Sequence, residues 1–347
     1  MQAPGAANAG PDRRVQPRSR LPGLPAGDYG TRPLRWKNRC HRAVLSQIFK
    51  LVFLVHCPAS RGVFSGGGVR TDLRSACFRG MVWRVSLIKM ESLRVITFNI
   101  AHGRGLGIYQ GFTTRRRLRH NLRAIGSLLA GHRADVVAMQ EVDEDSVWNR
   151  RVNLLHEIGD SAGLEHRVMG IHNRHSGRFR LNYGTAVLSR FPVRAHHNEP
   201  FGSRRLGEKG FLYTEIDTGG EHPIPVLNLH LDFRSRARRL EQVGRIVDFF
   251  EGPEYQLTPL PPVVCGDFNV ASHRSLDATA ELFRYLNHRH GYRLLPEGAR
   301  TFPAQWPRRT IDFVFVPKRF RIVRCEVIRS FLSDHRPVLV ELQVAGL

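Results

Sequence analysis

The sequence predicts an α/β (α+β) fold in which two mixed β-sheets pack face to face with helices on the outside. Short apolar runs typical of strands alternate with amphipathic stretches of helical spacing, and the strand runs are more numerous. Some consecutive strand runs are separated by turn residues and others by a helical stretch. The fold therefore needs both antiparallel hairpins and helical crossovers, which a mixed sheet system provides.

The first half of the predicted domain opens with strand runs at 93–98 and 136–139. A helix lies between them: Thr113 or Thr114 suits its N-cap and Gly131 its end. Its apolar side chains form one stripe, consisting of Leu118, Leu122, Ile125 and Leu129. A second helix is expected around 154–158, and a strand at 185–188 ends before the strand-breaking Pro192.

The second half continues with strand runs at 211–216 and 226–231, separated by the turn residues Gly219, Gly220 and Pro223. A helix over 240–250, a strand at 263–265 and a helix around 282–286 follow. Strands at 311–316, 322–328 and 338–344 finish the chain. No internal repeat is visible in this succession.

The first 89 residues differ in composition from the rest of the chain. They carry 16 Lys and Arg against 3 Asp and Glu, which is +13 of the formal net charge of +23. The opening stretch through Pro33 is rich in Pro, Gly and Arg without apolar periodicity, as in disordered segments. Met90 stands three residues before the first strand run, as an initiator would. We therefore expect residues 1–89 to be a disordered or non-native extension and 90–347 to form the folded domain, which the intact mass of the native protein tests.

Targeting and cysteine signals point to a reducing compartment. The N-terminus lacks the basic start and apolar run of a signal peptide. The apolar stretch 43–57 is interrupted by Lys50 and His56 and is too short to span a bilayer. Only Cys265 and Cys325 fall within the predicted domain, and they lack the spaced partners of a zinc site or a disulfide framework. We expect a cytoplasmic protein.

Polar side chains recur where the strand runs end. Asn99, Glu141 and His230 each close a run, and Asp267 and Asn269 close the run at 263–265. In α/β proteins the carboxyl ends of strands gather the functional groups. Asp267 and Asn269 are two residues apart, so they face the same side of extended backbone. A single Gly-Asp-Phe-Asn segment is more often a simple turn, but five such positions in order favour a metal-assisted phosphoester hydrolase.

At this spacing and order the chain resembles the endonuclease/exonuclease/phosphatase superfamily of metal-dependent phosphoester hydrolases, over residues 93–342. The resemblance implies the deoxyribonuclease-like four-layer sandwich, and the pattern is similar to that of deoxyribonuclease-like and sphingomyelinase-like members. It is carried by Thr97-Phe98-Asn99, Met139-Gln140-Glu141-Val142, Tyr183-Gly184-Thr185-Ala186-Val187-Leu188-Ser189-Arg190, Asn228-Leu229-His230-Leu231, Gly266-Asp267-Phe268-Asn269, Thr310-Ile311-Asp312 and Ser333-Asp334-His335.

The resemblance implies a divalent cation and its ligands. Glu141 would be the principal ligand of Mg²⁺ or Mn²⁺, with Asn99 and Asp334 nearby in the metal and phosphate shell. Asp267 would orient or deprotonate the attacking water, and Asn269 would donate an amide hydrogen bond to a phosphate oxygen. One carboxylate-bound ion fits better than two, because the histidine-rich pattern of dinuclear phosphatases is missing.

The histidines complete the implied set. His335 would contact the phosphate or transfer a proton, with its imidazole held by Asp312. His230 resembles a second histidine that serves as general acid in deoxyribonuclease-like and sphingomyelinase-like members, whereas apurinic-site endonucleases lack it. Asp334 and His335 are neighbours and would face opposite sides of a straight strand, so both reach one phosphate only if the backbone bends there. A basic loop at 172–180 is either a second phosphate contact, with Arg178 as candidate, or a solvated charge run.

Three functions remain open from the sequence. The pI near 11.1 favours phosphate-rich partners, either nucleic acid or anionic lipid, although the excess of Arg over Lys also arises from nucleotide composition. The first is a phosphodiesterase acting on nucleic acid. The second acts on a lipid or small phosphoester, as His230-Leu231-Asp232 and the following helix with Arg239 and Gln242 suggest. The third, a non-catalytic basic nucleic-acid-binding protein, is disfavoured because every catalytic position is filled. No organic cofactor is expected, and we expect a monomer.

Overall fold

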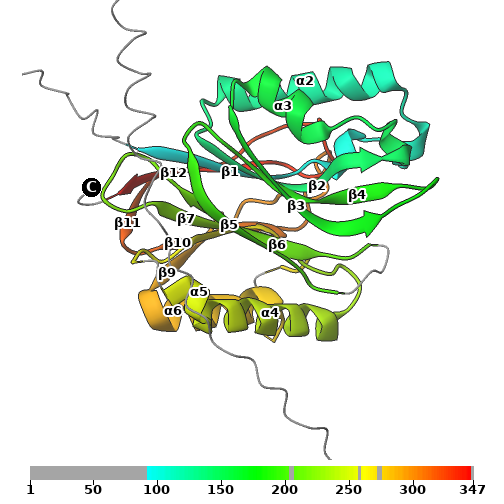
Figure 1. The fold of residues 1–347 in the computed structure, drawn as a ribbon. Helices are drawn as coiled ribbons and strands as arrows, with labels where there is room; N and C mark the ends of the chain where they lie inside the picture. Colours follow the sequence, from blue (N-terminus) through cyan, green and yellow to red (C-terminus); the bar gives the residue numbers. More distant parts are fainter. Residues whose placement is uncertain (1–91, 203–206, 257–258, 272–275, 345–347) are drawn as a thin grey trace, which may run out of the picture. The chain divides into compact units, whose positions relative to one another are not determined.

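The computed structural model describes residues 92–202, 207–256, 259–271 and 276–344. These residues form two mixed sheets, as predicted, and each has six strands (Figure 1). The first sheet has the order β11-β12-β1-β2-β4-β3 and the second has the order β5-β6-β7-β8-β10-β9. The predicted extension 1–89 lies outside the described residues. Within the described part, no helix has the length and apolar character needed to cross a membrane.

The strands of the first sheet are β1 (Leu93–Asn99), β2 (Val136–Ser146), β3 (His166–His175), β4 (Leu181–Ser189), β11 (Phe320–Val327) and β12 (Val338–Val344). Those of the second are β5 (Val193–Pro200), β6 (Gly210–Ile216), β7 (Ile224–His230), β8 (Val263–Asp267), β9 (Tyr292–Leu295) and β10 (Asp312–Pro317). The helices are α2 (Arg115–Gly131), α3 (Leu154–Ala162), α4 (Arg236–Glu251), α5 (Pro253–Gln256) and α6 (Ala278–His290), with short 3₁₀ turns η1 (Ala101–Gly103), η2 (Gln110–Phe112) and η3 (Val147–Asn149).

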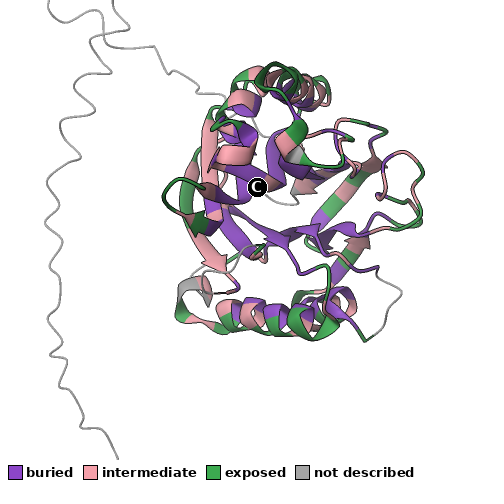
Figure 2. Ribbon diagram, turned by 90° about the vertical axis from the view of Figure 1, so that its right-hand side faces the viewer, coloured by how far each residue is buried: buried purple, intermediate pink, exposed green. Residues whose placement is uncertain are grey.

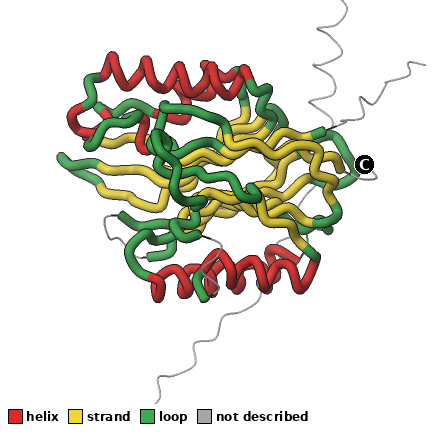
Figure 3. Tube along the Cα trace, turned by 180° about the vertical axis from the view of Figure 1, so that it is seen from behind, coloured by secondary structure: helices red, strands yellow, loops and turns green. Residues whose placement is uncertain are grey.

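Three apolar clusters hold four layers together. The middle cluster lies between the sheets and joins side chains such as Val95 and Val136 to Val226 and Val263. A second cluster packs α2 and α3 against the first sheet, and a third packs α4 and α6 against the second. The helices accordingly form the two outer layers and the strands the two inner ones (Figures 1 and 3). Burial follows this order, with buried strands inside and exposed outer helix faces (Figure 2).

The helix predicted between the first two strands is α2, and its local signals are confirmed. Thr114 is the N-cap, because its side-chain oxygen accepts a hydrogen bond from the backbone N–H of Arg117. The predicted stripe of four apolar side chains is buried against the first sheet. The helix ends at Gly131, as expected.

The sequence missed the edge strands β3, β5 and β9, and the physical reason is their position. β5 has no buried residue, and β3 is mostly half-buried, so neither carries the apolar runs by which interior strands are recognised. β9 has only four residues. A strand at the edge of a sheet is less buried, so it can be polar or short. The sequence does not show which strands lie at an edge.

Strand direction brings the predicted polar positions to the same end of both sheets. β1 and β2 are parallel, and β12 runs antiparallel to β1. In the second sheet β7 and β8 are parallel, and β10 runs antiparallel to β8. In each sheet the carboxyl ends of two strands therefore lie beside the amino end of a third.

Two local features hold this end of the sandwich together. Gly266 has φ +145°, and a Cβ there would lie 1.9 Å from the carbonyl oxygen of Leu229, so only glycine allows β8 to approach β7 this closely. Between the sheets, the buried Asn228 donates hydrogen bonds to the carbonyl oxygens of Met139 and Ala186, at 2.9 Å each. Gln140 in turn donates to Asn228 Oδ1 at 2.7 Å.

Candidate active site

One cleft of about 390 Å³ collects the polar side chains from both sheets. Of the predicted residues, Asn99, Glu141, His230, Asp267, Asn269, Asp334 and His335 line it, together with Arg104, Lys209, Phe233, Phe302, Arg309 and Ile311. Asp312 lies behind His335 and is 1% exposed. Arg178 is exposed in the turn between β3 and β4 and is not among the residues that line the cleft. That turn belongs to the β3–β4 hairpin at the edge of the first sheet, and a phosphate contact of Arg178 stays a prediction.

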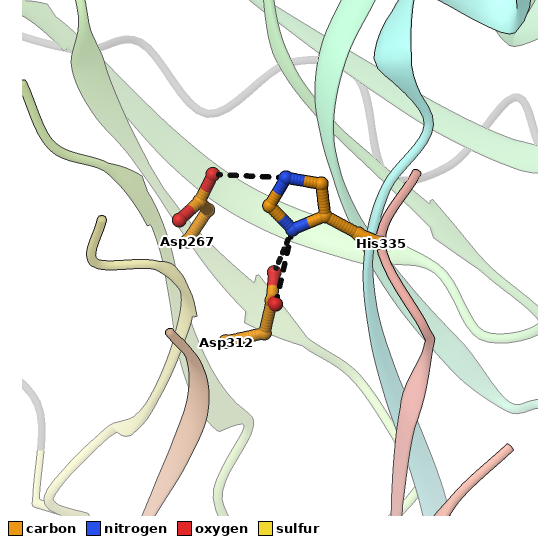
Figure 4. A group of neighbouring side chains, drawn as sticks. All are labelled: Asp267, Asp312 and His335. Atoms are coloured by element: carbon orange, nitrogen blue, oxygen red, sulfur yellow. Dashed lines mark hydrogen bonds and ion pairs between the residues drawn. The ribbon is translucent and has the colours of Figure 1, made fainter. Parts of the chain in front are cut away.

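The pair Asp312–His335 is the most tightly held part of the cleft (Figure 4). His335 Nδ1 lies 3.0 Å from both carboxylate oxygens of Asp312, and Nε2 lies 3.8 Å from Asp267 Oδ2. Burial alone would lower the pKa of His335, but the carboxylates of Asp312 and Asp267 outweigh it and raise the pKa to about 10. His335 is therefore a buried imidazolium at neutral pH.

The backbone bend that Asp334 and His335 need is present. Residues 332–335 form a bend before β12, and Ser333 fixes it by donating a hydrogen bond to the carbonyl oxygen of Asn99 at 2.7 Å. Asp334 then faces Arg104, whose Nη2 donates to Asp334 Oδ2 at 2.6 Å. The two neighbouring side chains consequently line the same cleft.

Asp267 lies between two imidazoles and an amide. Its Oδ2 accepts a hydrogen bond from Asn99 Nδ2 at 2.9 Å and faces His230 Nε2 at 3.3 Å. Burial opposes ionisation of Asp267, but His335 and His230 lower its pKa below the ordinary value. These neighbours therefore keep Asp267 in its carboxylate form.

Asn269 adopts left-handed backbone with φ 57°, which asparagine tolerates well. Its backbone N–H donates to Asp267 Oδ1 at 2.9 Å, so the Gly-Asp-Phe-Asn segment is a turn as well as part of the cleft. Its side-chain Nδ2 donates to the carbonyl oxygen of Leu231 at 2.9 Å. This bond uses one of the two amide hydrogens and leaves the other for a substrate oxygen.

Glu141 is turned into the cleft by an irregularity in β2. The register between β2 and β4 shifts from Gln140 to Val142, and Glu141 has φ 56°. Its carboxylate lies 3.6 Å from Lys209 Nζ and 3.6 Å from His102 Nε2. Burial would raise the pKa of Glu141, but His102 and Lys209 overcome this effect and hold it far below its ordinary value.

Lys209 and His102 were not anticipated from the sequence. Lys209 precedes β6, and the pairing of Gly210 with His230 brings it to the cleft, a register that no sequence motif shows. Its Nζ lies 3.3 Å from His230 Nδ1. An ammonium group only donates, so Nδ1 is the acceptor and the proton of His230 sits on Nε2, the atom that faces Asp267. His102 follows Asn99 by three residues, and this closeness to a predicted site residue is its one sequence signal.

The donors in the cleft suit a hard divalent cation. Glu141 and Asp334 offer carboxylate oxygens, which Mg²⁺ and Mn²⁺ prefer. Asn99 adds an amide oxygen, Oδ1, which also accepts a hydrogen bond from the backbone N–H of Ala101 at 3.0 Å. Asp267, Asp312 and His335 form a second group, whose ligand atoms lie within 4.8 Å of one another. Since Asp312 and His335 already bind each other, the Glu141 side of the cleft is the better place for the ion.

Comparisons with known proteins identify relatives of this chain. The model of the Endonuclease/Exonuclease/phosphatase family matches residues 96–335. The chain is 27% identical to the uncharacterized protein YbhP of Escherichia coli (strain K12) over 270 residues, which cover 73% of this chain and 97% of YbhP.

Two solved structures illustrate the shared fold. The endonuclease/exonuclease/phosphatase from Bacteroides vulgatus matches with a TM-score of 0.57 at 17% identity, covering 73% of this chain and 99% of the other. A mannosyl-6-phosphatase of Bacteroides thetaiotaomicron VPI-5482 matches with a TM-score of 0.53 at 19% identity, covering 72% and 99%. Since the family model spans more than half of the chain, the protein belongs to the endonuclease/exonuclease/phosphatase family, whose members are generally hydrolytic phosphoesterases.

Proposed function

We propose that the protein is a Mg²⁺- or Mn²⁺-dependent phosphodiesterase that uses a water molecule as nucleophile. One observation carries the proposal: Asp267, 1% exposed, lies between His230, Asn99 and His335 in a cleft that also contains Glu141. A carboxylate in such a position serves as a general base. A cation bound at Glu141, Asn99 and Asp334 supplies electrostatic stabilisation of charge on the phosphoryl oxygens.

The residues of the chain divide the remaining tasks. Asp267 orients the water and takes its proton as the oxygen attacks phosphorus. The imidazolium of His335, held by Asp312, and the free amide hydrogen of Asn269 bind phosphate oxygens and offset their charge.

His230 protonates the leaving oxygen as the phosphorus–oxygen bond breaks. Its Nε2 carries the proton, and its Nδ1 faces the ammonium of Lys209 at 3.3 Å. As Nε2 gives its proton to the leaving oxygen, Nδ1 takes one from Lys209, so His230 ends the step neutral. The site is restored when Nδ1 returns its proton to Lys209, Nε2 takes a proton from solvent and Asp267 releases to solvent the proton that it took from water. The leaving group departs as an alcohol and the product is a phosphomonoester.

The test is hydrolysis by the full-length chain with Mg²⁺, with Mn²⁺ and with a chelator. Substrates are bis(p-nitrophenyl) phosphate, plasmid DNA, RNA and sphingomyelin, with p-nitrophenyl phosphate and mannose 6-phosphate as monoesters. Mannose 6-phosphate is included because a protein of this fold is described as a mannosyl-6-phosphatase. We expect turnover of the diester that the chelator abolishes and Mg²⁺ restores. Binding of DNA or RNA without hydrolysis of any substrate would instead support the non-catalytic nucleic-acid-binding alternative.

A further inference from the structure

A buried polar cluster lies behind Glu141 and is separate from the residues that line the cleft. His102, in η1, is its centre: Nδ1 donates to Asp143 Oδ2 at 2.8 Å, and Nε2 lies 3.6 Å from Glu141 Oε2. The imidazole therefore links a buried carboxylate to the carboxylate proposed to hold the cation. None of the steps described above uses this cluster.

Asp143 anchors the imidazole. Its side chain is fully buried and receives two further hydrogen bonds, from Trp148 Nε1 at 2.7 Å and from Asn149 Nδ2 at 2.6 Å. Since the carboxylate only accepts, Nδ1 of His102 carries a proton and the ring cannot flip without losing this bond. The ring edges also meet the aromatic rings of Trp148 and Tyr183, with centroids 5.1 and 5.2 Å apart. Three side chains from β2, η3 and β4 thus fix the direction of Nε2.

Both ends of the link adopt left-handed backbone. His102 has φ 53° and Glu141 has φ 56°. Such conformations of non-glycine residues persist only where the surrounding structure imposes them, and they concentrate at functional sites. The cluster and the bulge of β2 together aim these two side chains at each other.

We propose that His102 is a positioning residue for Glu141, and that the chain Asp143–His102–Glu141 sets the orientation in which Glu141 receives the divalent cation. The inference rests on the proposed function. His102 Nε2 faces Oε2 from the buried side at 3.6 Å, whereas Oε1 faces the ammonium group of Lys209, also at 3.6 Å. Partners of this kind behind a ligand typically change metal affinity or activity by about 10- to 100-fold when they are removed.

Two substitutions separate positioning from a purely structural role. In His102→Asn the shorter amide keeps the hydrogen bond to Asp143 and suits left-handed backbone, but it no longer reaches Glu141. In His102→Gln the longer amide places a donor where Nε2 was, so it keeps the contact with Glu141 and gives up the one with Asp143. Asp135→Asn is the matched control, because Asp135 is a buried carboxylate beside the opposite end of β2, bonded to Arg94 and Arg190.

The experiment measures Mn²⁺ binding to the full-length chain by electron paramagnetic resonance, together with the melting temperature and the Mg²⁺ dependence of turnover. We expect His102→Asn to lose about tenfold or more in Mn²⁺ affinity with little change in melting temperature. Excess Mg²⁺ should restore its turnover. His102→Gln should melt earlier yet bind Mn²⁺ nearly as well as the wild type, and Asp135→Asn should change stability alone.

The outcomes distinguish the two proposals. Equal Mn²⁺ affinity in the wild type and in His102→Asn would overturn the positioning role and leave the proposed function standing. If Mn²⁺ affinity falls in proportion to melting temperature across all three variants, the positioning role of His102 is overturned as well. A wild-type chain that binds no Mn²⁺ would overturn both proposals.

Discussion

The two halves of the sandwich share one plan and supply different chemistry. Each sheet has a central parallel pair, β1 with β2 or β7 with β8, and each has an antiparallel strand whose amino end meets the carboxyl ends of that pair. The half built on the first sheet contributes Asn99, Glu141, Asp334 and His335. The half built on the second contributes Lys209, His230, Asp267, Asn269 and Asp312.

The surroundings of the carboxylates show how the halves differ. In the first half Asp334 and Glu141 face the guanidinium of Arg104, at 2.6 and 3.9 Å, and Glu141 also faces the imidazole of His102 at 3.6 Å. In the second half both carboxylates face imidazoles, Asp267 that of His230 at 3.3 Å and Asp312 that of His335 at 3.0 Å. We infer that the first half binds the cation and the second half moves the protons, and that neither half is a site alone.

The largest effect is expected for Asp267→Asn. The amide retains the shape of the side chain but cannot take a proton, so kcat should fall by up to about 10⁴-fold. Mn²⁺ affinity and melting temperature should stay close to those of the wild type. A large loss of Mn²⁺ affinity would contradict the inference that the first half binds the cation and the second half moves the protons, because Asp267 would then contribute to cation binding as well.

Glu141→Gln is the matching test of the first half. Loss of the anionic ligand should weaken Mg²⁺ binding by at least about 100-fold, more than the loss of a residue behind it. Turnover at limiting Mg²⁺ should fall accordingly and recover in part at high Mg²⁺, which a Mg²⁺ titration of initial rates measures. Full activity of the wild type in the presence of a chelator would contradict the proposed metal dependence.

His230→Ala tests protonation of the leaving group. A diester with an alkyl leaving group should react about 10²-fold more slowly, because the alkoxide then departs without a proton. Bis(p-nitrophenyl) phosphate should lose much less, since nitrophenolate is a stable leaving group. Equal losses on both substrates would place His230 in another role.

The smallest effect concerns stability at high pH. The folded-state pKa of His335 is about 10, above the ordinary value of 6.5, so the pair with Asp312 contributes fully below about pH 6.5 and its contribution is lost as pH rises through about 10. The free energy of unfolding of the wild type should therefore decline over this window. In Asp312→Asn the decline should be smaller, because the amide no longer favours the imidazolium. Urea titrations at several pH values measure both, and identical slopes would contradict the charged pair.

The chain itself determines most of the fold and much of the cleft. Interior strands can be predicted from the sequence because their burial requires runs of apolar residues. The capped helix α2 can be predicted because its buried face requires a regular apolar stripe. The same pattern identifies the polar residues that end these strands, such as Asn99, His230 and Asp267. A polar side chain directly after a buried strand stands out against the apolar run before it.

Only the tertiary structure decided which other groups meet them. The register between β6 and β7 brings Lys209 to His230, and the left-handed turn of Glu141 brings it to His102. Arg178, which the sequence offered as one possible phosphate contact, lies in an edge hairpin and is not among the residues that line the cleft. Contacts between side chains distant in the sequence depend on strand register and local backbone angles, and the spacing of residue types along the chain encodes neither of them.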